Sequence, residues 1–401
     1  MTASAFRLSA RAETVKASEI RELLKLVGRP TMISFAGGIP DPSLFALGDF
    51  QAAAREIFAG PASAREALQY STTEGFLPLR QWLADYMGKK GVAAGPDNIL
   101  VTSGSQQALD LIGKLTLDQG DTVLVSRPSY LGALQCFTSY GARFAAHDAP
   151  LDVATDPAKL LYLIPDFANP DGRTMDRGAR LAALSRAERL NALIVEDAAY
   201  TDLRYDGADL PPIAALDQQQ SGSIELTRTL YCGTFSKTLS PGLRIGWVCG
   251  PAALIRKLAL FKQGGDLHTA TFNQRLMHHV ALTGFEAQIE RSRITYRARR
   301  NAMLSALERH APPALRWTRP EGGMFIWLTL PEDIDATGLL SEAIAADIAF
   351  VPGGAFFTDG SGRNAMRLSF SLADEAQIEI GIYKLCALIN APRKKRAAMG
   401  R

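Results

Sequence analysis

The feature that most constrains the fold is an alternation of short apolar segments with amphipathic ones, which begins at about residue 97. Helix-like segments start near residues 105 and 130 and cover residues 177–190. Apolar strands that alternate with helices predict a mainly parallel sheet buried on both faces. The predicted strands are 98–102 (NILVT), 122–126 (TVLVS), 160–164 (LLYLI), 192–196 (ALIVE), 229–232 and 245–249.

The two ends of the chain differ from this central part. Residues 1–50 combine a short helix with a Gly/Pro-rich stretch, and a long helix, two strand-like segments and a last helix follow Arg291. We therefore expect a large α/β domain at 51–288. A small α+β domain would combine the N-terminal arm, 1–50, with the C-terminal part, 289–401.

Composition excludes several classes of protein. Hydrophobic residues make up 47% of the 401 residues and charged residues 21%, as in a soluble globular protein. A net charge of +3 gives no argument for nucleic-acid binding, and no stretch approaches 18 apolar residues. The four cysteines form no CxxC pair, and the N-terminus has no apolar signal core. These features predict a cytoplasmic protein without a metal site, a disulfide framework or a membrane partner.

The run at 233–246 (GTFSKTLSPGLRIG) places one lysine among small hydroxyl residues just after a strand. A lysine that forms an imine needs close backbone, little steric cover and a nearby anion partner. Arg244, seven positions after Lys237, supplies a fork suited to phosphate, and Thr234 and Ser236 add hydroxyl donors. A surface lysine rarely lies in such a run, so the pattern predicts a Schiff-base lysine and pyridoxal phosphate (PLP).

Other candidates follow the predicted strands. Ser105 opens a helix whose N-terminus favours an anion, although an ordinary N-cap at Ser103 or Ser105 is the alternative. Tyr130 could stack on a planar cofactor or simply pack. Asp197 ends a buried strand, where a carboxylate needs a partner such as a protonated pyridine nitrogen. Its alternative role is to cap the next helix.

Three further residues complete the set. Tyr200 could reach the ring oxygen beside Asp197, and the amide of Asn169 could donate to the same oxygen unless 169–172 is a plain turn. Arg367 interrupts a strand-like run, 366–370. It would pair with an α-carboxylate if it faces a cleft, or with solvent if it does not.

The order of these residues resembles that of the fold-type I PLP-dependent aminotransferases over nearly the whole chain. Three segments are similar to the branch of aminoadipate (LysN-type) and kynurenine aminotransferases: 17–26 (ASEIRELLKL), 34–40 (SFAGGIP) and 68–75 (LQYSTTEG). The resemblance implies a large domain with a mainly parallel seven-stranded sheet, a small α+β domain and a homodimer with shared sites.

The resemblance also implies a role for each site residue. Lys237 would form the Schiff base and shuttle the proton, Asp197 would pair with the ring nitrogen, and Asn169 and Tyr200 would bind the ring oxygen. Tyr130 would stack on the ring. The phosphate would be held by Ser105, Gln106, Thr234, Ser236, Arg244 and Tyr70 of the neighbouring subunit. Gly38, Asn169 and Arg367 would bind the substrate's α-carboxylate. Arg21 would meet a distal carboxylate, or else lie solvated on its helix.

The expected activity is therefore transfer of an amino group from an L-amino acid to a 2-oxo acid, such as 2-oxoglutarate or pyruvate. A β-lyase or decarboxylase on the same scaffold is the alternative, because fold and cofactor do not fix the reaction. A non-catalytic effector-binding protein would need a DNA-binding segment before the PLP core, and only about 17 residues precede the first helix pattern.

Overall fold

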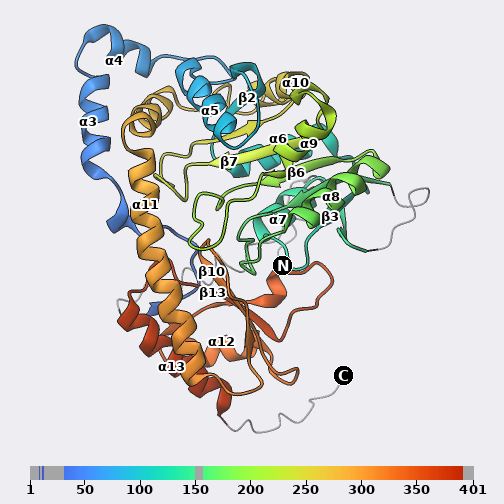
Figure 1. The fold of residues 1–401 in the computed structure, drawn as a ribbon, viewed down its shortest axis with the longest axis vertical. Helices are drawn as coiled ribbons and strands as arrows, with labels where there is room; N and C mark the ends of the chain where they lie inside the picture. Colours follow the sequence, from blue (N-terminus) through green and yellow to red (C-terminus); the bar gives the residue numbers. More distant parts are fainter. Residues whose placement is uncertain (1–8, 10, 13–30, 150–156, 392–401) are drawn as a thin grey trace.

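The computed structural model describes residues 9, 11–12, 31–149 and 157–391. The predicted helix at 17–26, with Arg21, lies outside the described residues. No helix in the described part is both long enough and apolar enough to cross a membrane. Figure 1 shows an upper layered body built around one sheet and a smaller lower body, with a long helix passing along both.

The large sheet has seven strands and is mainly parallel, as predicted. In spatial order they are β2 (Ile99–Thr102), β8 (Gly246–Cys249), β7 (Thr229–Thr234), β6 (Leu193–Asp197), β5 (Ala158–Leu163), β3 (Thr122–Val125) and β4 (Arg143–Ala146). Only β8 runs antiparallel to its neighbours, and all other pairs are parallel. The edge strand β4 was not predicted, because its sequence Arg-Phe-Ala-Ala is short and its side chains are only partly buried.

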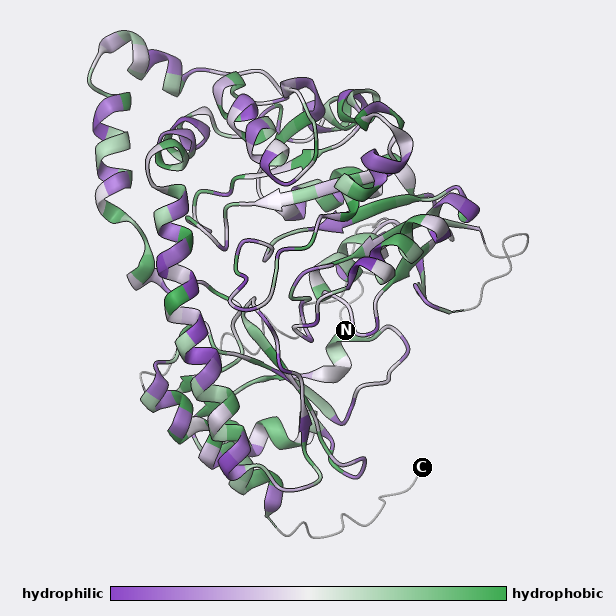
Figure 2. Cartoon of the chain, in the orientation of Figure 1, coloured by the Kyte–Doolittle hydropathy of each residue, from purple (hydrophilic) through white to green (hydrophobic). Residues whose placement is uncertain are grey.

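Helices cover both faces of this sheet, which explains why its strands are apolar on both sides. Along β2, Leu100 packs into one hydrophobic cluster and Ile99 and Val101 into another, because successive side chains point to opposite faces. The first face carries α6 (Ser105–Thr116), α7 (Leu131–Thr138) and α10 (Ala252–Gln263). The other carries α5 (Leu77–Lys89), α8 (Arg177–Leu190) and α9 (Ile213–Ser221). Figure 2 shows the strands as hydrophobic between these helices.

The lower body joins segments from both ends of the chain. A four-stranded antiparallel sheet has the order β12 (Val351–Pro352), β13 (Ala365–Ser369), β10 (Phe325–Thr329) and β9 (Arg316–Trp317). Near it, β1 (Ile33–Ser34) pairs in parallel with β11 (Ile348–Ala349). The helices here are α12 (Ala336–Ala345) and α13 (Glu375–Asn390). The N-terminal segment is thus tied to residues more than 300 positions away.

One helix of 40 residues, α11 (Thr271–His310), connects the two bodies. Its N-terminal half packs on α3 (Leu47–Ile57), α4 (Pro61–Leu68) and α5, and its C-terminal half packs on α13. The sequence predicted a long helix only after Arg291, and the actual helix begins 20 residues earlier. The predicted boundary between residues 288 and 289 falls inside this continuous helix, and the division into domains stays a prediction.

Candidate active site

The predicted site residues follow the carboxyl ends of the parallel strands. Ser105 follows β2, Tyr130 follows β3, Asn169 follows β5, Asp197 ends β6 and Lys237 follows β7. Ligands of open α/β sheets bind at this edge, because the loops there diverge and leave a crevice. A cavity of about 800 Å³ lies at this place. Twelve of the predicted residues line it: Gly38, Ser105, Gln106, Tyr130, Asn169, Asp197, Tyr200, Thr234, Ser236, Lys237, Arg244 and Arg367.

One end of the cavity is built to receive an anion. Helix α6 begins at Ser105, and its N-cap is Gly104, with no side-chain cap on the helix end. Neither Ser103 nor Ser105 therefore acts as the ordinary N-cap that the sequence allowed; the hydroxyl of Ser103 instead donates to Asp266 Oδ2 at 2.9 Å. A Cβ on Gly104 would overlap the guanidinium of Arg244, so only glycine lets this arginine approach the helix end. Free N–H groups, the helix dipole and a guanidinium together favour phosphate.

Hydroxyl groups complete this end of the cavity. The Thr234 hydroxyl donates to Ser236 Oγ at 2.9 Å, and the Ser236 backbone N–H donates to Thr234 Oγ1 at 3.1 Å. The Gln106 amide donates to the Gly132 carbonyl at 3.0 Å, which ties α6 to the start of α7. These bonds hold small polar groups beside the helix end without closing it.

The amine of Lys237 is held inside the cavity. Its Nζ donates to the carbonyl of Gly38 at 2.8 Å and lies 5.9 Å from the centre of the Tyr200 ring. Burial, and after it the positive charges of Arg367 and Arg244, lower the pKa of Lys237 to about 8, against the opposing effect of Asp197. The neutral form of an amine is the nucleophile and the base. A lysine of this kind is suited to covalent chemistry near neutral pH.

The carboxylate of Asp197 is buried and only half satisfied. Its Oδ2 accepts a hydrogen bond from the Tyr162 hydroxyl at 2.6 Å, and its Oδ1 is fully enclosed and has no hydrogen-bond partner in the part of the chain that the structure describes. Burial raises the pKa of Asp197 to about 6, while Tyr162, the Ala199 backbone and Lys237 act in the opposite direction. An orphaned acceptor this deep in a protein is costly unless a ligand supplies a donor. Asp197 does not cap a helix, which was the alternative.

A chain of hydrogen bonds links three residues that line the cavity: Asn169, Tyr200 and Arg367. The Asn169 amide donates to Tyr200 Oη at 3.3 Å, and Arg367 Nη1 donates to Asn169 Oδ1 at 2.8 Å. Arg367 is 3% exposed, lies with its guanidinium carbon 4.3 Å from the centre of the Phe325 ring, and has an Nε without a hydrogen-bond partner among the described residues. Burial lowers its pKa to about 10, so it stays charged at neutral pH. The arginine faces the cavity rather than solvent.

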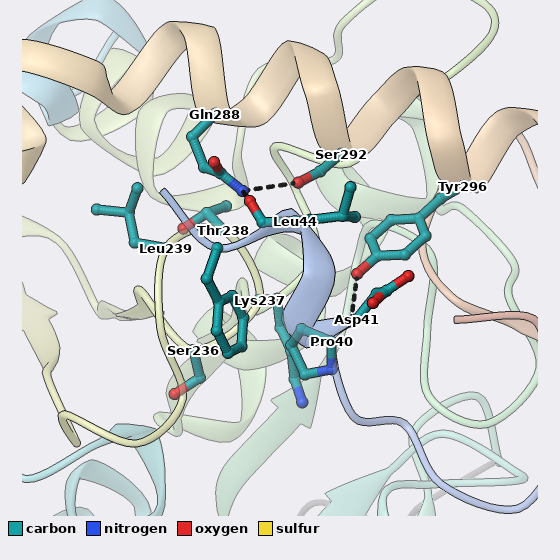
Figure 3. Close-up of a pocket in the computed structure, with 11 residues that line it drawn as sticks. Pro40, Asp41, Leu44, Ser236, Lys237, Thr238, Leu239, Gln288, Ser292 and Tyr296 are labelled. Carbon is teal, nitrogen blue, oxygen red and sulfur yellow. Dashed lines mark hydrogen bonds between the residues drawn. The ribbon is translucent and has the colours of Figure 1, made fainter. Parts of the chain in front are cut away.

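A second cavity of about 10 Å³, the size of one water molecule, is lined by Lys237 and by residues of the N-terminal arm and of α11. The contacts around it anchor the arm. Figure 3 shows side chains of α11 reaching the arm from one side: the Tyr296 hydroxyl accepts a hydrogen bond from the backbone N–H of Asp41 at 3.0 Å, and the Gln288 amide donates to the carbonyl of Leu44 at 2.8 Å. This anchoring fixes the arm that presents Gly38 to Lys237. A Cβ on Gly38 would lie 2.5 Å from Cζ of Phe325, which explains the glycine.

Tyr70 is the predicted residue that the structure describes away from the cavity. It is 77% exposed and packs its ring edge-on against His268 at 5.6 Å. The other remaining residue, Arg21, lies outside the described residues. Further residues that the sequence did not predict contact the set, above all Tyr162 and Phe325. Tyr162 was the one hydroxyl inside the apolar run LLYLI, and a hydroxyl in a buried strand needs a partner, which was a usable signal.

The donors and acceptors present fit pyridoxal phosphate. The enclosed Oδ1 of Asp197 lacks the donor that a protonated ring nitrogen would supply, and the helix end beside Arg244 is shaped for a phosphate. Lys237, whose pKa is lowered, lines the same cavity. An anion site, an amine and an unpaired carboxylate in one cavity match the three attachment points of this cofactor.

Comparison with known proteins supports the same assignment. Residues 44–385 match the model of the family described as aminotransferase class I and II. A 2-aminoadipate transaminase of Thermus thermophilus is 42% identical over 92% of this chain and 93% of its own length. Aromatic-amino-acid aminotransferase 1 of Thermococcus litoralis is 42% identical over 96% of this chain and 95% of its own.

A solved structure extends the likeness to the fold. The kynurenine aminotransferase of Pyrococcus horikoshii, crystallised with PMP, is 42% identical, and the match covers 95% of this chain and 96% of that one with a TM-score of 0.87. The chain is therefore a pyridoxal-phosphate-dependent enzyme that belongs to the class I and II aminotransferases, in the branch of the aminoadipate and kynurenine aminotransferases.

Proposed function

We propose that this aminotransferase carries out its reaction with Lys237 as the covalent attachment point and proton carrier. The observation that carries the proposal is the position of the amine. Lys237 lines the cavity together with Asp197, Arg244 and Arg367, and its pKa is lowered to about 8. A substantial fraction of the amine is thus neutral near pH 8, and it can accept a proton.

The other residues would hold the cofactor. When bound, pyridoxal phosphate supplies a protonated ring that withdraws electrons from the substrate's Cα. Asp197 would accept the ring N–H, Asn169 and Tyr200 would bind the ring oxygen, and Tyr130 would cover the ring face. The phosphate would lie at the start of α6, held by Ser105, Gln106, Thr234, Ser236 and Arg244.

The chain's own groups then bind and move the substrate's atoms. Arg367 offers two N–H groups in a fork that fits an α-carboxylate, and its burial excludes competing water. The Gly38 backbone and the Asn169 amide would complete this pocket. With the carboxylate fixed there, the Cα–H bond would come within reach of Lys237, whose neutral Nζ would take the Cα proton and return it during amino transfer.

We propose an L-amino acid donor with either an acidic or a large apolar side chain, and 2-oxoglutarate or pyruvate as acceptor. The relatives named for 2-aminoadipate and for aromatic amino acids support both kinds of donor. Arg21 would meet the distal carboxylate of an acidic donor. In a panel of amino acids, Arg21→Ala should lose acidic donors selectively, measured as single-turnover conversion of the cofactor to its pyridoxamine form. Equal loss of every donor would contradict this role.

We also propose a homodimer with shared sites, located in the cytoplasm. Tyr70 and the neighbouring Leu68 are 77% and 72% exposed, and a second subunit that covered them would bring Tyr70 to its partner's phosphate site. Helices α3 and α4 project from the upper body beside these residues (Figure 1). The cytoplasmic location rests on four free cysteines, which are typical of a reducing compartment.

The decisive experiment removes the amine. Wild-type protein should show a cofactor absorbance that borohydride abolishes by trapping the covalent link, with attachment faster as pH rises toward about 8. Lys237→Ala should bind the cofactor without this link and lose activity by at least about 10³-fold. Lys257→Ala, which removes an exposed lysine of α10, is the control. An unchanged covalent link in Lys237→Ala would refute the assignment.

A further inference from the structure

The carboxylate of Asp197 accepts a hydrogen bond from a tyrosine that has no role in the proposed function. Tyr162 lies in β5, next to β6, and is 0% exposed. Its hydroxyl donates to Asp197 Oδ2 at 2.6 Å, and its ring packs edge-on against Phe137 of α7 with 5.9 Å between centres. The strand and this ring contact together fix where the hydroxyl points.

The contact treats the two oxygens of the carboxylate differently. Oδ2 has the Tyr162 donor, and among the described residues Oδ1 has no hydrogen-bond partner. Asp197 lines the large cavity, and Oδ1 is the carboxylate oxygen that still lacks a donor there. A hydrogen bond to one oxygen restrains rotation of the carboxylate, and it thereby restrains the direction of the other oxygen.

The donor is also neutral. Burial raises the pKa of Tyr162 well above the usual value of a tyrosine, and the Asp197 charge raises it further. The hydroxyl therefore keeps its proton at all physiological pH values. An arginine or lysine at this position would cancel the charge of Asp197 and compete with a protonated ring nitrogen for it, whereas a phenol holds the carboxylate and leaves its charge.

We propose that Tyr162 is a positioning residue for the reaction: its hydroxyl directs Asp197 Oδ1 at the cofactor's ring nitrogen and weakens the carboxylate's affinity for the shared proton, so that the proton stays on the ring. The inference rests on the proposed pairing of Asp197 with that nitrogen. Tyr162 of β5 would thus control the protonation of the Asp197 carboxylate at the end of β6.

The electrostatics of the site agree in direction. Burial is the largest influence on Asp197 and raises its pKa, and the Tyr162 hydrogen bond is the largest influence that lowers it. Without Tyr162, the carboxyl would hold its proton more tightly. The shared proton would then move from the ring nitrogen toward Asp197.

The test follows the ring nitrogen itself, using enzyme reconstituted with ¹⁵N-labelled pyridoxal phosphate. In Tyr162→Phe, which keeps the aromatic ring, the ¹⁵N resonance should move toward its unprotonated position at neutral pH, and cofactor affinity should fall about tenfold. Tyr231→Phe is the matched control, because Tyr231 is a buried tyrosine of the same sheet (1% exposed) and does not line the cavity. It should leave the resonance in place.

A double-mutant cycle with Asp197→Asn separates this inference from the proposed function. If Asp197→Asn moves the resonance and Tyr162→Phe does not, the role of Tyr162 is overturned and that of Asp197 stands. If Asp197→Asn leaves the resonance unmoved, the proposed pairing itself fails. Tyr162→Phe should add nothing in the Asp197→Asn background, and a full effect there would also overturn the inference.

A gentler substitution covers the case in which Tyr162→Phe does not fold. Incorporating 3-fluorotyrosine at position 162 keeps the shape of the side chain and makes its hydroxyl a stronger donor. The resonance should then move in the opposite direction, toward the fully protonated position. A shift toward the unprotonated position would contradict the inference.

Discussion

Glu196 and Asp197 are consecutive residues at the end of the same buried strand, and their carboxylates have different hydrogen-bond environments. They are 1% and 4% exposed and point to opposite faces of the sheet. Glu196 accepts hydrogen bonds from the backbone N–H groups of Ile213 and Ala214, both at 2.8 Å, at the start of α9. Asp197 has one tied oxygen and one orphaned oxygen.

The satisfaction of their oxygens by protein donors distinguishes a structural carboxylate from a functional one. Burial raises the pKa of both, to about 7 for Glu196 and about 6 for Asp197. The size of the shift therefore does not distinguish them. What does is whether the protein itself satisfies every acceptor: helix α9 does this for Glu196, and nothing in the described residues does it for Asp197 Oδ1.

The largest expected effect is on catalysis. Asp197→Asn should lower kcat/KM for amino transfer by about 10²- to 10³-fold, because the charge that stabilises the protonated ring is lost. Glu196→Gln, its neighbour on the same strand, should change kcat/KM less than about threefold. Steady-state kinetics with a saturating cofactor measures both. Similar losses of kcat/KM in the two variants would contradict the assignment of different roles to the two carboxylates.

The next effect concerns stability and its pH dependence in the apoenzyme. A carboxyl whose pKa is higher in the folded than in the unfolded protein stabilises the fold at low pH, and this stability is lost as pH rises. For Glu196 the loss should fall between pH 4.5 and about 7 and amount to about 3 kcal/mol. Glu196→Gln should remove that slope, measured as the free energy of unfolding by denaturant.

Glu196→Gln should also be less stable than wild type at pH 5, by about 1–3 kcal/mol, because one N–H of α9 loses its acceptor. The deficit should shrink at pH 8, where wild type carries the cost of a buried charge. A slope in Glu196→Gln equal to that of wild type would show that another group causes it.

The smallest effect separates the two carboxylates by their response to the cofactor. In the apoenzyme, Asp197 should lower stability as pH rises from 3.8 to about 6. With pyridoxal phosphate bound, a protonated ring nitrogen would lower the pKa of Asp197, and this part of the slope should disappear while the Glu196 part remains. Unfolding curves with and without cofactor measure the difference, with Asp197→Asn as control. Persistence of both parts would contradict the pairing.

Much of the site was predictable because the chemistry follows the ends of parallel strands. Lys237, Asp197 and Asn169 each come after an apolar run, and runs of this kind meet at one edge of a sheet. The glycines of the lysine run also carried a signal, since Gly233 and Gly246 pack against Trp247 and the start of α6 where a Cβ would clash.

Other features were outside the reach of local pattern. The strands β1, β9, β11 and β12 have two residues each, which is too short for an alternating pattern to be recognised. Helix α11 was placed too late, because its first ten residues, 271–280, include none that is exposed and so show little amphipathic contrast. The direction of β8 depends on its antiparallel pairing with β2 and β7, and its sequence is as apolar as that of the parallel strands in the same sheet.

The sequence alone determined the family, the cofactor and the order of the site residues along the chain, because these depend on residue types at fixed places relative to strands. Only the tertiary structure decided which of them touch. Lys237 meets the Gly38 carbonyl 199 positions away, Arg367 turns inward to Asn169, and Tyr162 takes one oxygen of Asp197. Such contacts depend on strand register and helix packing, since a shift of one residue along β6 would exchange Asp197 for Glu196 on the face of the cavity.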